Sequence, residues 1–142
     1  MTRQDTLNIV ANIDNLDEVI EWMDELLMSC GYNGSARVQL DIAVEEIYVN
    51  IAHYAYETEG GGSAKITITV EDDPLRATVR FEDSGRPYDP LSREEPDITL
   101  SAKERRIGGL GIFMTKKSMD HMNYEYRKGK NILTIVKNYV SD

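Results

Sequence analysis

The sequence has a single cysteine and fewer basic than acidic residues. It also lacks an apolar run near the ~20 residues that cross a bilayer. With Cys30 alone, the chain cannot form an internal disulfide, which favours a reducing compartment. Its 25 acidic and 16 basic residues give a net charge of −9, which argues against a nucleic-acid-binding face and against binding to anionic membranes. No apolar segment typical of a signal peptide follows residues 1–5. We therefore expect a soluble, cytoplasmic protein.

The 142 residues have the length of one domain, and they contain no internal repeat, low-complexity tract or dividing linker. We therefore predict a single domain over residues 1–142. The negative charge does not exclude a phosphate ligand, because backbone N–H groups can hold phosphate without net positive charge.

Hydrophobic periodicity predicts the order of the elements. Alternating apolar residues indicate strands at 7–13, 65–70 and 75–81, and a later hairpin at 124–128 and 132–137. Helical spacing indicates helices over 16–27, about 35–56 and about 110–120, with Asn15 and Glu18 as a capping box and Ser35 as an N-cap. This order predicts an α+β fold, a two-layer sandwich whose mixed, mostly antiparallel sheet is covered on one face by about three helices.

The predicted second helix carries the first candidate site. At about 100° per residue, Glu46, Asn50 and His53 fall within roughly 60° of one another beside the core stripe, whereas Glu45 points away. An asparagine amide oxygen is a hard ligand that suits Mg²⁺, and a carboxylate one turn away could accept a proton from a nucleophile. The alternative is an ordinary polar fringe on an amphipathic helix.

A second candidate site lies where the strand over 75–81 ends, at Asp83, Ser84 and Gly85. These residues also have the composition of an ordinary turn. In a pocket, the Asp83 carboxylate could accept a hydrogen bond from an exocyclic amine such as that of adenine. Gly85 would then let the backbone come close to the base.

A third motif, Gly108, Gly109, Leu110 and Gly111, leads into the predicted third helix. Glycines there expose backbone N–H groups that form an anion site for phosphates, although a plain glycine-rich loop has the same composition. The segment before them has no sustained period, holds three of the four prolines and carries charges of both signs. Loops of this length in compact domains are typically functional, which predicts a lid over about residues 87–108.

Together these motifs resemble those of the Bergerat-fold ATPases, the superfamily of gyrase, heat-shock chaperones, histidine kinases and mismatch-repair ATPases. The Glu46–Asn50 pair resembles the N box, Asp83–Gly85 the G1 box and Gly109–Gly111 the G2 box. The surrounding residues are similar to the anti-sigma factor serine/threonine kinases, which are free-standing domains of about this length. The resemblance covers nearly the whole chain and implies a histidine-kinase-like ATPase domain that binds ATP and Mg²⁺.

The resemblance also implies a role for each motif residue. Asn50 is the Mg²⁺ ligand, Glu46 is the general base on the attacking hydroxyl, and Asp83 recognises the adenine amine with Gly85 close by. The residues that wrap the phosphates are those of the last motif and its continuation: Gly108, Gly109, Leu110, Gly111 and Ile112.

Two positions depart from the family pattern. Family members often carry histidine four residues after the metal-binding asparagine, where this chain has Tyr54, and His53 stands one residue earlier. Both are therefore candidate nucleotide contacts. At the end of the lid, Lys103, Arg105 and Arg106 are the cations from which a γ-phosphate contact is expected, and the sequence does not choose among them.

For function, the resemblance implies a protein serine/threonine kinase that phosphorylates a small anti-sigma factor antagonist. Family members also hold a sigma factor inactive, usually as homodimers, and phosphorylation controls which partner is held. The residues alone leave three alternatives open. These are an ATP-dependent binding switch without catalysis, a free-standing histidine-kinase-type ATP-binding domain, and a two-layer domain that binds no nucleotide.

Overall fold

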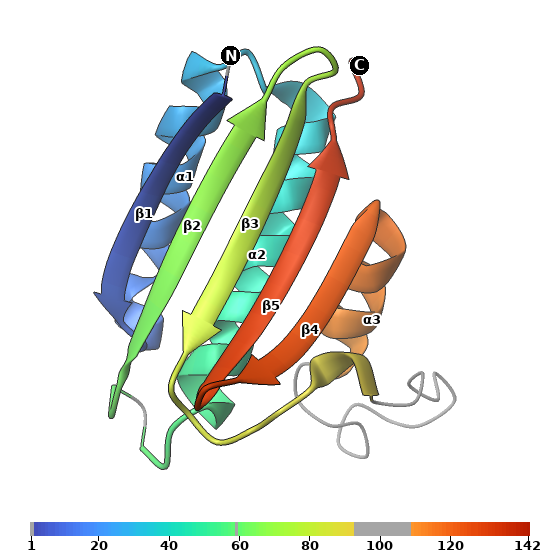
Figure 1. Ribbon diagram of the computed structural model, residues 1–142. Helices are drawn as coiled ribbons and strands as arrows, with labels where there is room; N and C mark the ends of the chain where they lie inside the picture. Colours follow the sequence, from blue (N-terminus) through green and yellow to red (C-terminus); the bar gives the residue numbers. More distant parts are fainter. Residues whose placement is uncertain (1, 59, 93–108) are drawn as a thin grey trace.

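The computed structural model describes residues 2–58, 60–92 and 109–142. Figure 1 shows two layers, a twisted sheet and the helices that cover one of its faces. The elements in chain order are β1 (Thr2–Val10), a 3₁₀ turn (Ile13–Asn15), α1 (Leu16–Ser29), α2 (Gly34–Tyr54), β2 (Ser63–Glu71), β3 (Arg76–Asp83), a second 3₁₀ turn (Pro90–Ser92), α3 (Gly109–Ser118), β4 (His121–Arg127) and β5 (Lys130–Asn138).

The described strands form one sheet in the order β1-β2-β3-β5-β4, and every neighbouring pair is antiparallel (Figure 1). The predicted α+β two-layer fold is confirmed, but the expected mixed character of the sheet is wrong for these strands. Two helices separate β1 from β2, so the chain returns in the opposite direction. Strands β3 and β4, which α3 connects, run in the same direction. They are not neighbours in the sheet, because β5 lies between them and is antiparallel to both.

The strand register turns one side chain of every two toward the helices, as the alternating pattern predicts. Central strands β2 and β3 pair Ile66 with Phe81 and Ile68 with Val79, and all four side chains are buried. Helix α2 lies between α1 and α3 against this face. Its hydroxyl-bearing Tyr48 is fully buried and donates to the carbonyl of Val10 at 3.0 Å. The middle of α2 is therefore part of the core.

Both predicted helix caps are wrong in detail. The side chain of Asn15 makes no cap hydrogen bond to α1; instead the Asn15 N–H donates to Asn12 Oδ1 at 3.1 Å, within the 3₁₀ turn. Helix α2 begins at Gly34 rather than after Ser35, and the Ser35 N–H donates to Asp142 Oδ1 at 3.0 Å. The chain terminus thus supplies the acceptor that a local cap was expected to supply.

The element ends differ from the sequence pattern by a few residues. Strand β1 ends at Val10, so Ile13 lies in the 3₁₀ turn although its apolar phase continues that of the strand. Helix α2 ends at Tyr54, two residues earlier than expected, and α3 spans Gly109–Ser118. No helix in the described part of the chain is long and apolar enough to cross a membrane.

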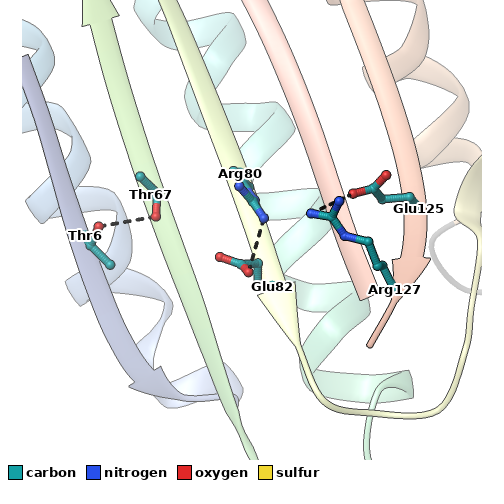
Figure 2. A network of polar contacts seen from close by, with 6 residues as sticks. All are labelled: Thr6, Thr67, Arg80, Glu82, Glu125 and Arg127. Atoms are coloured by element: carbon teal, nitrogen blue, oxygen red, sulfur yellow. Dashed lines mark hydrogen bonds and ion pairs between the residues drawn. The ribbon is translucent and has the colours of Figure 1, made fainter. Parts of the chain in front are cut away.

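The face of the sheet opposite the helices is polar. Figure 2 shows Thr6 beside Thr67, with their hydroxyls 3.2 Å apart, and the ion pair of Arg80 with Glu82 at 3.4 Å. A further pair, Arg127 with Glu125, spans 3.6 Å on β4. Ion pairs that are open to solvent on at least one side contribute little to stability. The free energy of folding therefore comes mainly from the buried face.

Where α1 meets α2, Arg37 Nη1 lies 3.0 Å from Asp24 Oδ2 and 3.3 Å from Asp41 Oδ2. Burial and the neighbouring Asp24 carboxyl raise the pKa of Asp41 to about 8, whereas the Arg37 guanidinium lowers it. Between the ordinary pKa and this raised value, the native state binds a proton that the unfolded chain releases. Stability therefore falls as the pH rises through this range.

We expect Asp41→Asn to flatten this pH dependence, because the amide stays neutral at every pH. Its free energy of unfolding should match that of the wild type near pH 4. At pH 8 it should exceed the wild type by about 1 kcal/mol, a value discounted for partial solvation. Urea unfolding between pH 4 and 8 measures this, with the exposed Asp17→Asn on α1 as the control. Parallel curves for Asp41→Asn and wild type would contradict it.

Candidate functional site

A cavity that is partly open to solvent lies between α2, α3 and strands β3, β4 and β5. Its walls are mostly apolar, with Ile47, Phe81 and Leu133 among them. Of the buried polar residues in the described chain, Asn50 and two on the strands also line it, a concentration that packing alone does not require. An apolar pocket with a few convergent polar groups is the usual form of a small-molecule site.

Asp83 supplies the carboxylate of the cavity. It ends β3 and is buried, with only 7% of its surface exposed. Its Oδ1 accepts hydrogen bonds from the Gly85 N–H and from Asn131 Nδ2, both at 2.9 Å. Burial raises the pKa of Asp83, and these two hydrogen bonds oppose the rise. The carboxylate is thus held in one orientation in an apolar wall.

Asn50 faces the same cavity from α2 and is 5% exposed. Within the described residues, neither its Oδ1 nor its Nδ2 has a hydrogen-bond partner. A buried amide without partners costs about 1–3 kcal/mol of stability. Since native proteins rarely keep such groups without a reason, its two polar atoms are suited to a ligand that completes them.

Glu46 lies one turn before Asn50 on α2 and is half-buried, whereas Glu45 is exposed, as helical spacing predicts. Partial burial, and then the charge of Glu45, raise the pKa of the Glu46 carboxyl. A raised pKa brings a carboxylate closer to the value that favours proton transfer near neutral pH. Glu46 does not line the cavity itself, so its position is at the edge of the site.

The segment after Asp83 is attached to the C-terminal end of α2. The Arg86 N–H donates to the Ala55 carbonyl at 2.9 Å, and Arg86 Nε donates to the Tyr54 carbonyl at 2.9 Å. A Cβ placed on Gly85 would meet the Ala55 carbonyl oxygen at 2.1 Å. Glycine is therefore required there by a close backbone approach, which joins the strand-end carboxylate to the helix that carries the amide.

The sequence matches the model of a known family over most of its length. The model of the family described as "Histidine kinase-like ATPase domain" matches residues 9–137. The chain belongs to this family. This match confirms the superfamily predicted from the three motifs.

Named relatives agree with this family. The chain is 28% identical over 116 residues to the serine-protein kinase RsbW of Listeria monocytogenes, a match that covers 79% of this chain and 71% of that protein. The RsbW kinase of Listeria innocua matches with the same identity and coverage. These relatives support a kinase-like ATPase that uses ATP.

Two solved structures share the fold. One contains the RsbU and RsbW domains of a Mycobacterium tuberculosis protein, with a TM-score of 0.67 and 14% identity over 96% of this chain and 32% of that one. This chain thus spans about a third of that solved chain. The other is the SiaB–SiaC complex of Pseudomonas aeruginosa, with a TM-score of 0.57 and 16% identity over 94% of this chain and 89% of that one.

Within this ATPase domain, several of the predicted site residues come together. The cavity is lined by Asn50, Asp83 and Ile112, and the Gly85 N–H donates a hydrogen bond to Asp83. The remaining residues of the glycine motif that the structure describes, Gly109, Leu110 and Gly111, form the first turn of α3. Gly108 lies outside the described residues, as do residues 93–108 of the predicted lid and its cations Lys103, Arg105 and Arg106.

The two positions that depart from the family pattern differ in their surroundings. Tyr54 is half-buried, and its ring stacks on Tyr88, a cavity-lining residue, with ring centroids 6.0 Å apart. His53 is exposed and does not line the cavity. The reason is angular: position 53 lies roughly 60° from Asn50 on the side away from Tyr54. The structure therefore brings Tyr54, and not His53, toward the site.

Among the cavity residues with polar side-chain groups, sequence reasoning missed three: Tyr88, Tyr124 and Asn131. The register pairs Asn131 with Asp83, so both face the helices. The sequence contains one indication of Asn131: it is a polar residue at an alternating position of β5 that is otherwise apolar, since Leu133 and Ile135 occupy the next two positions on the same face. The two tyrosines had no such signal, because tyrosine at a half-buried position is common in packing.

Gly85→Ala tests the close approach of β3 to α2. The added methyl group would overlap the Ala55 backbone, so the strand end must move. We expect a loss of about 1–3 kcal/mol in free energy of unfolding, as for other overpacked sites, and at least tenfold weaker ATP binding as Asp83 moves with it. Gly129→Asn is the control, since its surroundings are open and asparagine tolerates the positive φ of 77°. Unchanged ATP binding by Gly85→Ala would contradict the expectation.

Proposed function

We propose that this protein is an ATP-dependent protein serine/threonine kinase that phosphorylates a small anti-sigma factor antagonist. In this proposal it also binds a sigma factor as a homodimer, and phosphorylation selects the partner that is held. The RsbW kinases among its relatives support the serine-directed activity. The SiaB–SiaC structure, in which a protein of this fold is part of a complex, is consistent with a protein partner.

The observation that carries the proposal is the buried amide of Asn50, which has no hydrogen-bond partner among the described residues and lies one turn from the half-buried carboxyl of Glu46. Nucleotide completes this arrangement. Asp83 at the other end of the cavity accepts a hydrogen bond from the adenine amine, and the N-terminal turn of α3 receives the phosphates.

The residues present also fit Mg²⁺. The Asn50 oxygen is a hard donor without a competing hydrogen bond in the described chain. Mg²⁺ typically takes one or two protein oxygens and completes its shell with waters and phosphate oxygens. When bound, the metal neutralises the charge on the phosphates. Among the described residues there is no cluster of three His, Cys, Asp or Glu side chains that could hold a metal without the nucleotide.

In this scheme the residues of the chain mainly position the reactants, as in other phosphoryl transfers. Glu46 accepts the proton of the attacking serine or threonine hydroxyl, for which its raised pKa is suitable. Asn50 and the first turn of α3 hold the phosphates in line. Asp83 fixes the base, and the apolar walls exclude water from that end of the cavity.

The test is a phosphoryl-transfer reaction with ATP radiolabelled on its γ-phosphate, Mg²⁺, the purified chain and the small antagonist protein encoded by the same organism. Label on the antagonist that survives acid is the expected result, because phosphoserine and phosphothreonine are acid-stable. Acid-labile label would indicate a histidine kinase instead. Thermal stabilisation by Mg-ATP without any label would leave only an ATP-dependent binding switch.

A further inference from the structure

The Asn131 carboxamide on β5 lies at the Asp83 end of the cavity, and all of its hydrogen-bonding capacity is used. It is 6% exposed. Its Nδ2 donates to Asp83 Oδ1 at 2.9 Å and to the Arg86 carbonyl at 2.8 Å. Its Oδ1 accepts from the Tyr88 N–H at 3.1 Å and from the Tyr124 hydroxyl. An amide has two donors and two acceptor sites, so no capacity is left for a ligand.

The partners also fix which way the amide points. The Arg86 carbonyl can only accept a hydrogen bond, and the Tyr88 N–H can only donate one. Exchanging the nitrogen and oxygen of Asn131 would break both contacts. The NH₂ group is therefore held toward Asp83, its paired residue on the neighbouring strand β3.

This orientation determines what the Asp83 carboxylate presents to the cavity. Both hydrogen bonds that it accepts within the described chain use Oδ1. One donor is the Gly85 backbone N–H and the other is the Asn131 side chain. The other oxygen, Oδ2, is the atom that remains to accept a hydrogen bond from a base.

We propose that Asn131 is the positioning residue for base recognition: it holds Asp83 so that Oδ2 selects the exocyclic amine of adenine over an oxo group. This inference rests on the proposed function, since it requires that the cavity binds ATP. Asn131 acts through Asp83 and does not touch the base. The same amide is also hydrogen-bonded to the backbone of Arg86 and Tyr88, so it joins the end of β3 to the segment that follows it.

Adenine and hypoxanthine nucleotides separate positioning from general structural support. ITP carries an oxo group where ATP carries the amine, so it has no donor at that position for Asp83 Oδ2, and its N1–H, a donor, stands where adenine has an acceptor. If Asn131 only supported the fold, Asn131→Ala would weaken ATP and ITP equally. If it positions Asp83, the variant should weaken ATP about tenfold to a hundredfold, as expected for a hydrogen bond to a charged group, and ITP less than about threefold.

The experiment is isothermal titration of ATP and ITP, each with Mg²⁺, into wild type, Asn131→Ala, Asp83→Asn and the double variant. Wild type should prefer ATP, and Asn131→Ala should lose that preference. In the double variant, Asn131→Ala should add little to the effect of Asp83→Asn, because both remove one interaction. The matched control is Asn123→Ala on β4, an exposed asparagine that should leave both affinities unchanged.

Other outcomes are decisive as well. An Asn131→Ala variant that keeps the preference of the wild type for ATP would overturn the positioning role and leave the proposed function intact. Wild type that binds neither nucleotide would instead overturn the proposed function. If Asn131→Ala does not fold, Tyr124→Phe removes only the hydroxyl, which donates to Asn131 Oδ1 and accepts from the Tyr88 N–H at 3.3 Å. It should lower the ATP-to-ITP ratio about threefold, and an unchanged ratio would overturn the role.

Discussion

Replacing Glu46 with glutamine is expected to slow phosphoryl transfer about a hundredfold to ten-thousandfold, the range that a positioned general base supplies. Glutamine keeps the size and the half-buried position of the side chain but cannot accept a proton. ATP affinity should change by less than about threefold, because Glu46 does not line the cavity where the nucleotide is proposed to bind. Transfer rates with labelled ATP and titration of ATP measure the two effects separately.

Glu45→Gln is the matched control for this variant. It removes the same charge from the adjacent, exposed position of α2 and should leave the transfer rate nearly unchanged. The pH profile gives a second test: burial raises the pKa of Glu46, so transfer should decline as the pH falls through that raised value. Equal transfer by Glu46→Gln and wild type would show that another group takes the proton.

The sequence was sufficient for features that depend on local periodicity. Glu46 and Glu45 are adjacent, yet helical spacing alone separates the half-buried one from the exposed one. Strand alternation placed Asp83 at the end of β3, where the structure has it. Both inferences need only the repeat of one element, and no knowledge of what packs against it.

Contacts between distant segments could not be predicted in this way. Ser35 is hydrogen-bonded to Asp142, 107 residues away, so a search for a local cap could not find its partner. Asn131 contacts Asp83 across 48 residues, and its role depends on the order in which β5 inserts beside β3. Sequence pattern states which residues face inward, whereas strand order decides which of them meet.

The site residues that were predicted and those that were missed therefore have different functions in the cavity. In the proposed function Glu46, Asn50 and Asp83 interact with the reactants themselves, and their residue types suggest proton transfer, metal binding and hydrogen bonding. Asn131 instead donates a hydrogen bond to another side chain of the protein, so its role can be inferred only when Asp83 is known to lie beside it. A residue that positions a ligand-binding group is generally harder to find from sequence for this reason.

The second large effect is expected for Asn50→Leu, which removes from a mostly apolar cavity two polar atoms that have no partner in the described part of the chain. The free energy of unfolding without ligand should rise by about 1–3 kcal/mol, the cost of a buried polar group left unsatisfied. The thermal stabilisation that Mg-ATP gives the wild type should be largely lost. Urea unfolding, and thermal shifts with ATP in the presence of Mg²⁺ or of a chelator, measure these two changes.

Opposite signs for stability and binding distinguish a ligand-binding amide from a packing residue. Asn50→Asp is the matched variant, because it keeps an oxygen ligand while adding a charge to a buried site. It should be less stable than the wild type without ligand and should recover part of the difference when Mg²⁺ and ATP are added. If Asn50→Leu were instead less stable and still responded to Mg-ATP, Asn50 would be structural and the metal ligand would lie elsewhere. A gain in stability at the expense of binding would show that α2 keeps a destabilising amide for its ligand.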